Sequence, residues 1–159
     1  METVTAERII DAPIERVFDW ISNAHNYTRI PLVLTERLAT PGREAPYGTG
    51  AVRVLGWAVG WFWERITAYD PPHSFDYDVY RSLPPSRHRE GRVTFDSATG
   101  DDGVAATCVV WRTTFELSIP VIGGFLTRRV GVPLMTYAFR RILDEAEREL
   151  VTERTQVID

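Results

Sequence analysis

The stretch from residue 133 to residue 153 constrains the fold of this chain more than any other. Apolar residues recur there at spacings of three and four, the pattern of a helix with one apolar face: Met135, Phe139, Ile142, Ala146 and Leu150. Pro133 suits the first turn, because a first-turn residue needs no amide hydrogen. Asp144 and Arg148 are four residues apart with the acid first, which favours an ion pair along the helix. The sequence therefore predicts a long C-terminal helix whose apolar face lies across another layer.

Almost everything before this helix has the pattern of β-strands. Residues 4–11 predict a first strand, and Pro13 then opens a short helix that a second helical piece, Ala24–Arg29, follows. Six closely spaced strands come next, which indicates an antiparallel meander: residues 32–40, 51–57, 61–69, 74–81, 87–97 and 104–117. The glycine-rich stretch 119–132 fits a loop, a lid or a kinked first turn of the last helix, and the sequence leaves these three alternatives open.

Composition and charge exclude several classes of function. At 159 residues with a net charge of -4, the chain has the size of one domain and lacks the basic character of a nucleic-acid-binding protein. No stretch has the length and apolarity of a membrane span or a signal peptide, so we expect a cytoplasmic protein. The three histidines are scattered, and no glycine-rich loop precedes a helix. We therefore expect no metal and no cofactor.

Three segments carry a resemblance to a known family. They are DAPIERVFDWI at residues 11–21, YGTGAVRV at residues 47–54 and ERITAYDPPHSFDYDV at residues 64–79. With the strand at 107–111 and the helix that follows it, they resemble the START-like (SRPBCC, helix-grip) superfamily. The chain looks closest to its polyketide cyclase/dehydrase-type branch.

This resemblance implies an α+β domain spanning residues 1–159, in which a curved antiparallel sheet wraps around the long C-terminal helix. Two short helices follow its first strand. A deep cavity lies between sheet and helix in this superfamily. Its members bind lipids, sterols, hormones or polyketide intermediates, and some catalyse cyclisation, aromatisation or hydrolysis. The resemblance therefore implies a binding domain for a small hydrophobic molecule.

Strand alternation indicates which side chains face the helix. In the last strand the large aromatic residues favour the face that carries Trp111 and Phe115, and Phe95 and Phe75 match it on the neighbouring strands. Tyr137 and Arg141 are placed on the helix at the mouth of the cavity. The candidate ligand-binding residues are Trp57, Phe62, Phe75, Val79, Phe95, Val109, Trp111, Phe115, Met135, Tyr137, Phe139 and Arg141.

The hairpin at residues 57–63 contains four aromatic side chains, those of Trp57, Trp61, Phe62 and Trp63. One interpretation is a large core or a dimer interface. The other is a flat aromatic wall suited to a planar ligand. The sequence does not decide between them.

Two charged residues fall within the predicted apolar interior. Glu64 shares a strand face with Phe62 and Ile66, and Arg53 lies across the hairpin at the pairing position. A carboxylate and a guanidinium in an apolar cavity should pair, because a lone buried charge is strongly destabilising. The pair is either structural or catalytic, with Glu64 as a base and Arg53 holding a carbonyl or carboxylate. With Tyr77, whose hydroxyl suits the polarisation of a ketone, they are the candidate catalytic residues.

Three functional hypotheses follow, and the first is favoured. An enzyme of the polyketide cyclase or aromatase type would bring several buried polar groups together in the cavity. A non-catalytic carrier or sensor of a hydrophobic ligand would have a cavity lined almost entirely by apolar atoms. A homodimeric interaction module would have a filled cavity and an exposed aromatic hairpin.

Overall fold

The computed structural model describes residues 1–158 and contains one curved antiparallel sheet with helices on its concave side. The elements, in chain order, are β1 (Glu2–Ile10), α1 (Ile14–Ser22), the 3-10 helix η1 (Ala24–Arg29), β2 (Val33–Thr40), β3 (Val52–Trp57), β4 (Gly60–Asp70), β5 (Ser74–Leu83), β6 (Ser86–Thr99), β7 (Ala105–Leu117), α2 (Gly123–Leu126), the π-helical turn η2 (Thr127–Gly131) and α3 (Val132–Ile158). Each predicted strand is present, with ends that differ from the prediction by at most two residues.

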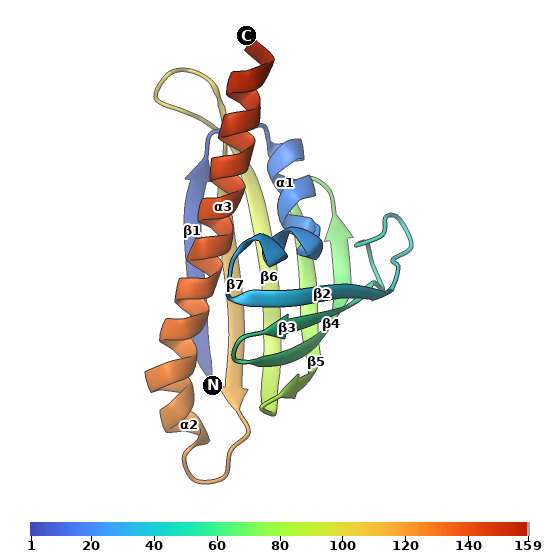
Figure 1. Ribbon diagram of the computed structural model, residues 1–159, viewed down its shortest axis with the longest axis vertical. Coiled ribbons are helices and arrows are strands. Elements are labelled where there is room, and N and C mark those ends of the chain that lie inside the picture. The colour runs from blue at the N-terminus through green and yellow to red at the C-terminus, as the bar shows by residue number, and fades with distance from the viewer. Residues whose placement is uncertain (159) are drawn as a thin grey trace.

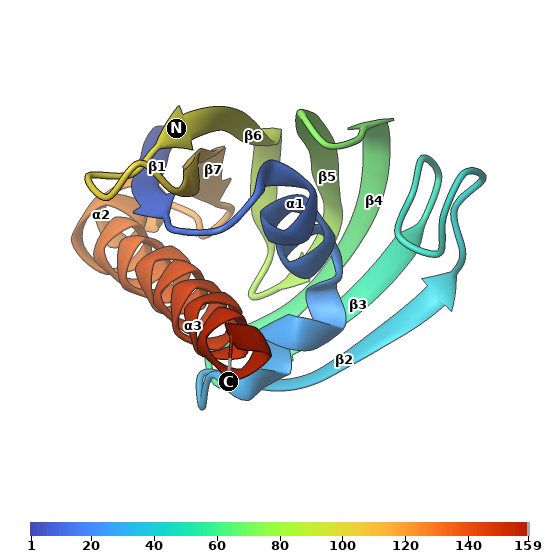
Figure 2. The ribbon, with the colours of Figure 1, turned by 90° about the horizontal axis from the view of Figure 1, so that it is seen from above.

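The sheet of the described residues has seven strands in the order β1-β7-β6-β5-β4-β3-β2. Strands β2 to β7 are neighbours in chain order, so the predicted meander is confirmed, and β1 joins it beside β7. Viewed from above, the strands form an arc that curves around the helices (Figure 2). Helix α3 runs along the open side of this arc (Figures 1 and 2). The arrangement confirms the predicted helix-grip α+β fold.

Helix α3 packs on the sheet through the apolar face that the sequence predicts. Phe139 stacks on Trp111 of β7 with 4.3 Å between the ring centroids, and Ile142, Ala146 and Leu150 are buried. The predicted ion pair between Asp144 and Arg148 is wrong, because both residues have other partners. Since α3 crosses β1, Arg8 of β1 pairs with both Asp144 and Glu147, while Arg148 pairs with Glu145.

The stretch 119–132 is largely helical and leads directly into α3, so the kinked first turn is the alternative that holds. Pro133 lacks the amide hydrogen that an unbroken α-helix needs, and the π turn η2 lies just before it. Thr127 anchors this segment to the end of β7. Its hydroxyl donates to the carbonyl of Gly123 at 2.7 Å and accepts from the amide of Leu117 at 2.8 Å. The helical segment therefore begins ten residues earlier than predicted, at residue 123.

Helix α1 fills one end of the concave interior. Phe18 packs edge-on against Phe75, Phe95 and Tyr69, with centroid distances of 6.2, 5.1 and 5.3 Å. Val17 and Ile21 of the same helix are fully buried. At the other end α3 and the turns before it cover the interior, and a cavity remains there.

Truncation of Phe139 tests this packing of α3. We expect Phe139→Ala to lower the free energy of unfolding by about 3–5 kcal/mol, because it removes a buried ring that stacks on Trp111. Tyr137→Ala, two residues earlier on the outer side of the helix, should change it by no more than about 0.5 kcal/mol. Urea unfolding of both variants measures the difference. Equal losses would mean that α3 does not pack through the Phe139 face.

Candidate functional site

A cavity of about 220 Å³ lies between the concave face of the sheet and the first turns of α3. Most of its wall is apolar, with a few polar side chains at one side. Seven of the predicted ligand-binding residues line it: Trp57, Phe62, Val79, Trp111, Phe115, Met135 and Phe139. Arg53, Glu64 and Tyr77, the three predicted catalytic residues, line it as well. Their roles stay predictions, but the structure brings them together.

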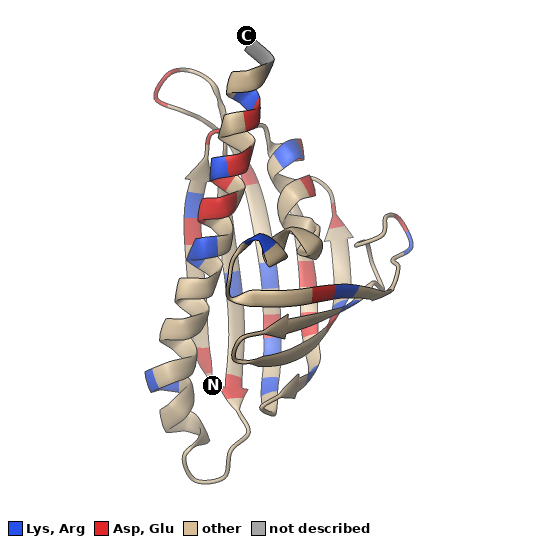
Figure 3. Cartoon of the chain, in the orientation of Figure 1, with Lys and Arg blue, Asp and Glu red and all other residues tan. Residues whose placement is uncertain are grey.

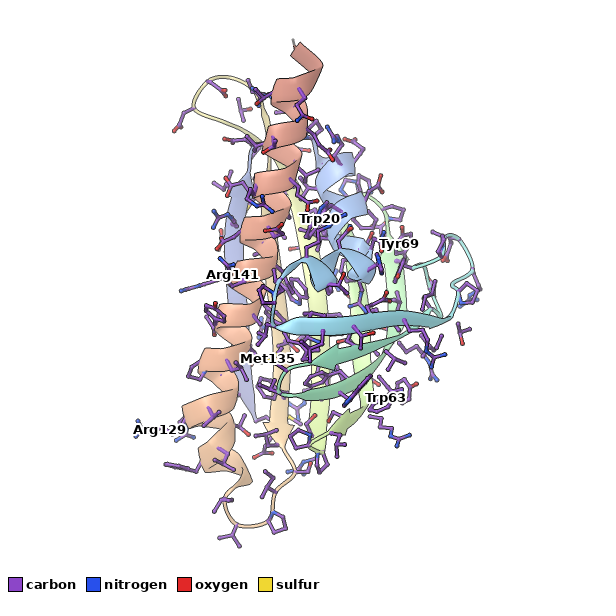
Figure 4. All side chains as sticks on the ribbon, viewed as in Figure 1. Trp20, Trp63, Tyr69, Arg129, Met135 and Arg141 are labelled. Carbon is purple, nitrogen blue, oxygen red and sulfur yellow. The ribbon has the colours of Figure 1, made fainter. Side chains whose placement is uncertain are left out.

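The five remaining predicted residues lie elsewhere. Phe75, Phe95 and Val109 face the interior as predicted, but they are outside the cavity lining, in the fully packed core that contains Phe18. The placement of Tyr137 and Arg141 at the cavity mouth is wrong. Each follows a cavity-facing helix residue by two positions, which turns its side chain by about 200°. Tyr137 is 57% exposed, and Arg141 extends away from the sheet, whereas Met135 lies toward it (Figure 4).

The centre of the polar side is an ion pair between neighbouring strands. Arg53 of β3 and Glu64 of β4 are register partners, and Nε of Arg53 donates to Oε2 of Glu64 at 2.6 Å. Only 1% of Arg53 and 8% of Glu64 is exposed. Burial, the largest single influence, disfavours the charged guanidinium, but Glu64, Tyr27 and Tyr77 together outweigh it and the pKa of Arg53 is raised. The arginine is therefore held in its cationic form.

Three aromatic rings surround the guanidinium carbon of Arg53. The centroids of Tyr27, Phe75 and Tyr77 lie 5.6, 5.8 and 5.4 Å from it. These distances are within the range in which a ring face attracts a cation. The rings therefore take the place of water around the part of Arg53 that Glu64 does not cover.

Two buried donors on β3 have no hydrogen-bond partner within residues 1–158. They are Nη1 of Arg53 and Nε1 of Trp57, and both residues line the cavity. An unpaired buried donor is destabilising by about 1–3 kcal/mol until an acceptor reaches it. Both donor atoms have almost no accessible surface, so they lie within the wall and are not themselves exposed to the cavity.

Tyr77 sits beside the ion pair as a neutral hydroxyl group. Its oxygen accepts a hydrogen bond from Nε1 of Trp111 at 2.9 Å. Burial, followed by the negative charge of Glu64, raises the pKa of Tyr77. The hydroxyl therefore keeps its proton and can donate it in a hydrogen bond.

His88 is a cavity residue that the sequence did not reveal. Its ring stacks on that of Tyr77 at 5.6 Å, and its Nδ1 accepts from the amide of Val79 at 3.1 Å. Oδ1 of Asp78 also lies 3.3 Å from Nδ1, and Nε2 lies 2.9 Å from the hydroxyl oxygen of Thr113. These contacts orient the ring.

A β-bulge turns His88 toward the cavity, against the simple alternation of β6. Counting back by twos from Gly91, Val93 and Phe95 puts residue 89 inside and residue 88 outside. The pairing of β6 with β7 shifts between His88 and Glu90, which reverses the alternation. Tyr27 is another cavity residue that was missed; it lies on η1, and its hydroxyl donates to the carbonyl of Ile21 at 2.6 Å. No periodic signal marks a residue on so short a helix.

With this geometry in place, sequence comparison identifies the family. A profile of the family described as "Polyketide cyclase / dehydrase and lipid transport" matches residues 1–153. The chain belongs to this family. A search of curated proteins gave no match. The START-like superfamily and its polyketide cyclase branch, predicted from the sequence, are thereby confirmed.

Solved structures similar to this chain share its fold at low sequence identity. TTHA0849 from Thermus thermophilus is 21% identical with a TM-score of 0.72, and the match covers 96% of this chain and 99% of that one. A START superfamily protein from Mycobacterium smegmatis is 12% identical with a TM-score of 0.63, covering 93% and 98%. The di-domain ARO/CYC BexL from the BE-7585A biosynthetic pathway is 16% identical with a TM-score of 0.66, covering 94% and 50%.

Residues 1–158 contain no group of three or more His, Cys, Asp or Glu residues that could hold a metal ion. Within the same range, no helix has both the length and the apolarity to cross a membrane.

A double-mutant cycle tests the buried ion pair. We expect Arg53→Met and Glu64→Gln each to lower the free energy of unfolding by about 3–5 kcal/mol, because each leaves the partner buried without compensation. The double variant should recover much of the loss, since neither charge then remains. Chemical denaturation of the four proteins gives the coupling energy. Additive losses would contradict a direct, buried interaction.

Proposed function

We propose that the protein binds a small, largely apolar molecule of the aromatic or polyketide type in this cavity and promotes its cyclisation or dehydration. One observation carries the proposal. A buried ion pair, Arg53 with Glu64, lies beside the ring of Tyr77 at one side of a mainly apolar cavity. The family description, which includes polyketide cyclases and dehydrases, supports it.

The size and walls of the cavity suit a compact, flat molecule. A dry protein cavity of about 150 Å³ accepts benzene, and this one measures about 220 Å³. Trp57, Phe62 and Trp111 contribute aromatic surface to its wall. A substituted ring or two fused rings fit this volume, and the rings of the wall favour a planar partner.

The polar groups suit an aldol-type ring closure. Oε2 of Glu64 is engaged by Arg53, so the other carboxylate oxygen takes a proton from a carbon that lies between two carbonyl groups. Tyr77 donates a hydrogen bond to the enolate oxygen as negative charge develops there. The enolate carbon attacks a second carbonyl of the same molecule, and the resulting alkoxide recovers the proton from Glu64. Loss of water from this alcohol completes the dehydration, with no oxidant or reductant.

A second candidate function is that of a non-catalytic carrier. The mainly apolar wall of the cavity favours it, because holding a hydrophobic molecule requires little more than burial of its surface. The carrier and the enzyme differ in what the polar groups do. In the carrier, Tyr77 and Glu64 would contribute to affinity alone.

Cyclisation of a short synthetic poly-β-ketone, followed by chromatography and mass spectrometry, tests the proposal. The wild-type protein should accelerate ring closure over the spontaneous reaction. Removal of the donor in Tyr77→Phe should slow it about 100-fold or more. Glu64→Gln in the Arg53→Met background, where no charge remains unpaired, should abolish the general-base contribution, about 100-fold to 10,000-fold.

Tyr80→Phe is the matched control, because Tyr80 is on the same strand but exposed. It should leave the rate unchanged. Binding of naphthol, a flat two-ring molecule, is measured separately. If the wild-type protein binds naphthol but does not accelerate ring closure over the spontaneous reaction, catalysis is contradicted and the carrier is favoured. Failure to bind naphthol as well would contradict both functions.

A further inference from the structure

Charge is sharply divided along the C-terminal helical segment. Residues 119–143 contain four arginines and no acidic residue, whereas residues 144–154 contain five acidic residues and two arginines. Figure 3 shows the acidic half of α3 at the C-terminal end and the basic residues below it. The chain as a whole carries a net charge of -4. The basic half therefore differs in sign from the rest of the molecule.

The basic half also carries exposed apolar side chains. Val121 is fully exposed and Phe125 is 64% exposed, and Ile122 and Val130 are exposed as well. Val121 has a φ of 69°, a region that a β-branched residue rarely adopts. No packing of this side chain compensates for the strained backbone. An unfavourable conformation that holds an apolar side chain in solvent points to a partner outside the chain.

Arginine and aromatic side chains alternate on this outer side. The guanidinium carbon of Arg129 lies 6.0 Å from the ring centroid of Phe125, and Tyr137 is exposed further along the same helical segment. Arg129 and Arg141 both extend away from the sheet (Figure 4). Neither has an ion-pair partner among residues 1–158. Their charge is therefore available to an anionic partner.

This surface borders the mouth of the cavity. Val130 lines the cavity and is 53% exposed, and Val59, in the turn between β3 and β4, lines it from the sheet side and is also exposed. A partner that covers Phe125 and Val130 therefore comes within reach of the opening.

We propose that this surface docks on an anionic lipid bilayer. We call it the basic-apolar surface and define it by Val121, Ile122, Phe125, Arg129, Val130, Tyr137 and Arg141. Single protruding apolar side chains insert between lipid headgroups, while arginines beside them remain at the level of the phosphates. Each basic side chain at an anionic membrane adds attraction. An acidic protein partner would also complement the arginines, but it would not explain why the side chain of Val121 is fully exposed and unpacked. The docking does not depend on which molecule the cavity binds.

Flotation with vesicles tests the charge part of the proposal. The full chain should bind vesicles of phosphatidylglycerol and phosphatidylcholine, and bind vesicles of phosphatidylcholine alone much more weakly. The double variant Arg129→Gln/Arg141→Gln should partition roughly thirty-fold less onto the anionic vesicles. The control Arg37→Gln/Arg43→Gln removes the same charge from β2 and the loop after it, and it should bind like the wild type.

A second pair of variants tests the apolar part. Val121→Ser/Phe125→Ser should lose most of the vesicle binding, whereas Ile9→Ser/Leu34→Ser, which changes two exposed apolar residues elsewhere, should keep it. Circular dichroism of both control pairs also shows whether the fold tolerates such changes. Absence of binding to the anionic vesicles would overturn the proposal and leave an acidic protein as the occupant. Equal binding to neutral vesicles, or equal losses in variants and controls, would overturn it too.

Discussion

The buried ion pair between Arg53 and Glu64 is the interaction on which the interior of this protein depends. Two opposite charges can remain inside an apolar core only if they meet each other and if other groups replace the lost water. The register of β3 with β4 places them directly opposite, and the rings of Tyr27, Phe75 and Tyr77 enclose the guanidinium. The same arrangement leaves one polar side in an otherwise apolar cavity.

The cavity exists because the two helices on the concave face of the sheet do not fill it to the same extent. Helix α1 fills one end with Phe18 and its aromatic neighbours. Helix α3 closes the other end with Phe139, which stacks on Trp111, and the pairing of Arg8 with Asp144 holds the helix to β1. Val130, Gly131 and Leu134 line the volume that remains. One helix thus closes the cavity and presents the basic-apolar surface beside its mouth.

Period-two and helical patterns were sufficient to predict the order of strands and helices, the inward strand faces and the pairing of Arg53 with Glu64, while the helix-grip fold followed from the family resemblance. They failed where tertiary contacts or irregular backbone decide. A bulge reversed the alternation before Gly91 and turned His88 inward, and Asp144 found a partner on β1 rather than on its own helix. Facing inward also proved different from lining the cavity, because α1 packs over Phe75 and Phe95. Sequence periodicity carries no information on which part of an interior another helix fills.

Native mass spectrometry of the purified protein, before and after denaturation, tests most directly whether the cavity is a binding site. We predict that the protein retains, or takes up when offered naphthol, one small molecule per chain. We also predict that Met135→Trp, which places an indole in the cavity, abolishes this binding, while the outward Tyr137→Trp does not. The cavity is not the binding site if the wild-type protein holds nothing and takes up no naphthol, or if both variants bind naphthol equally.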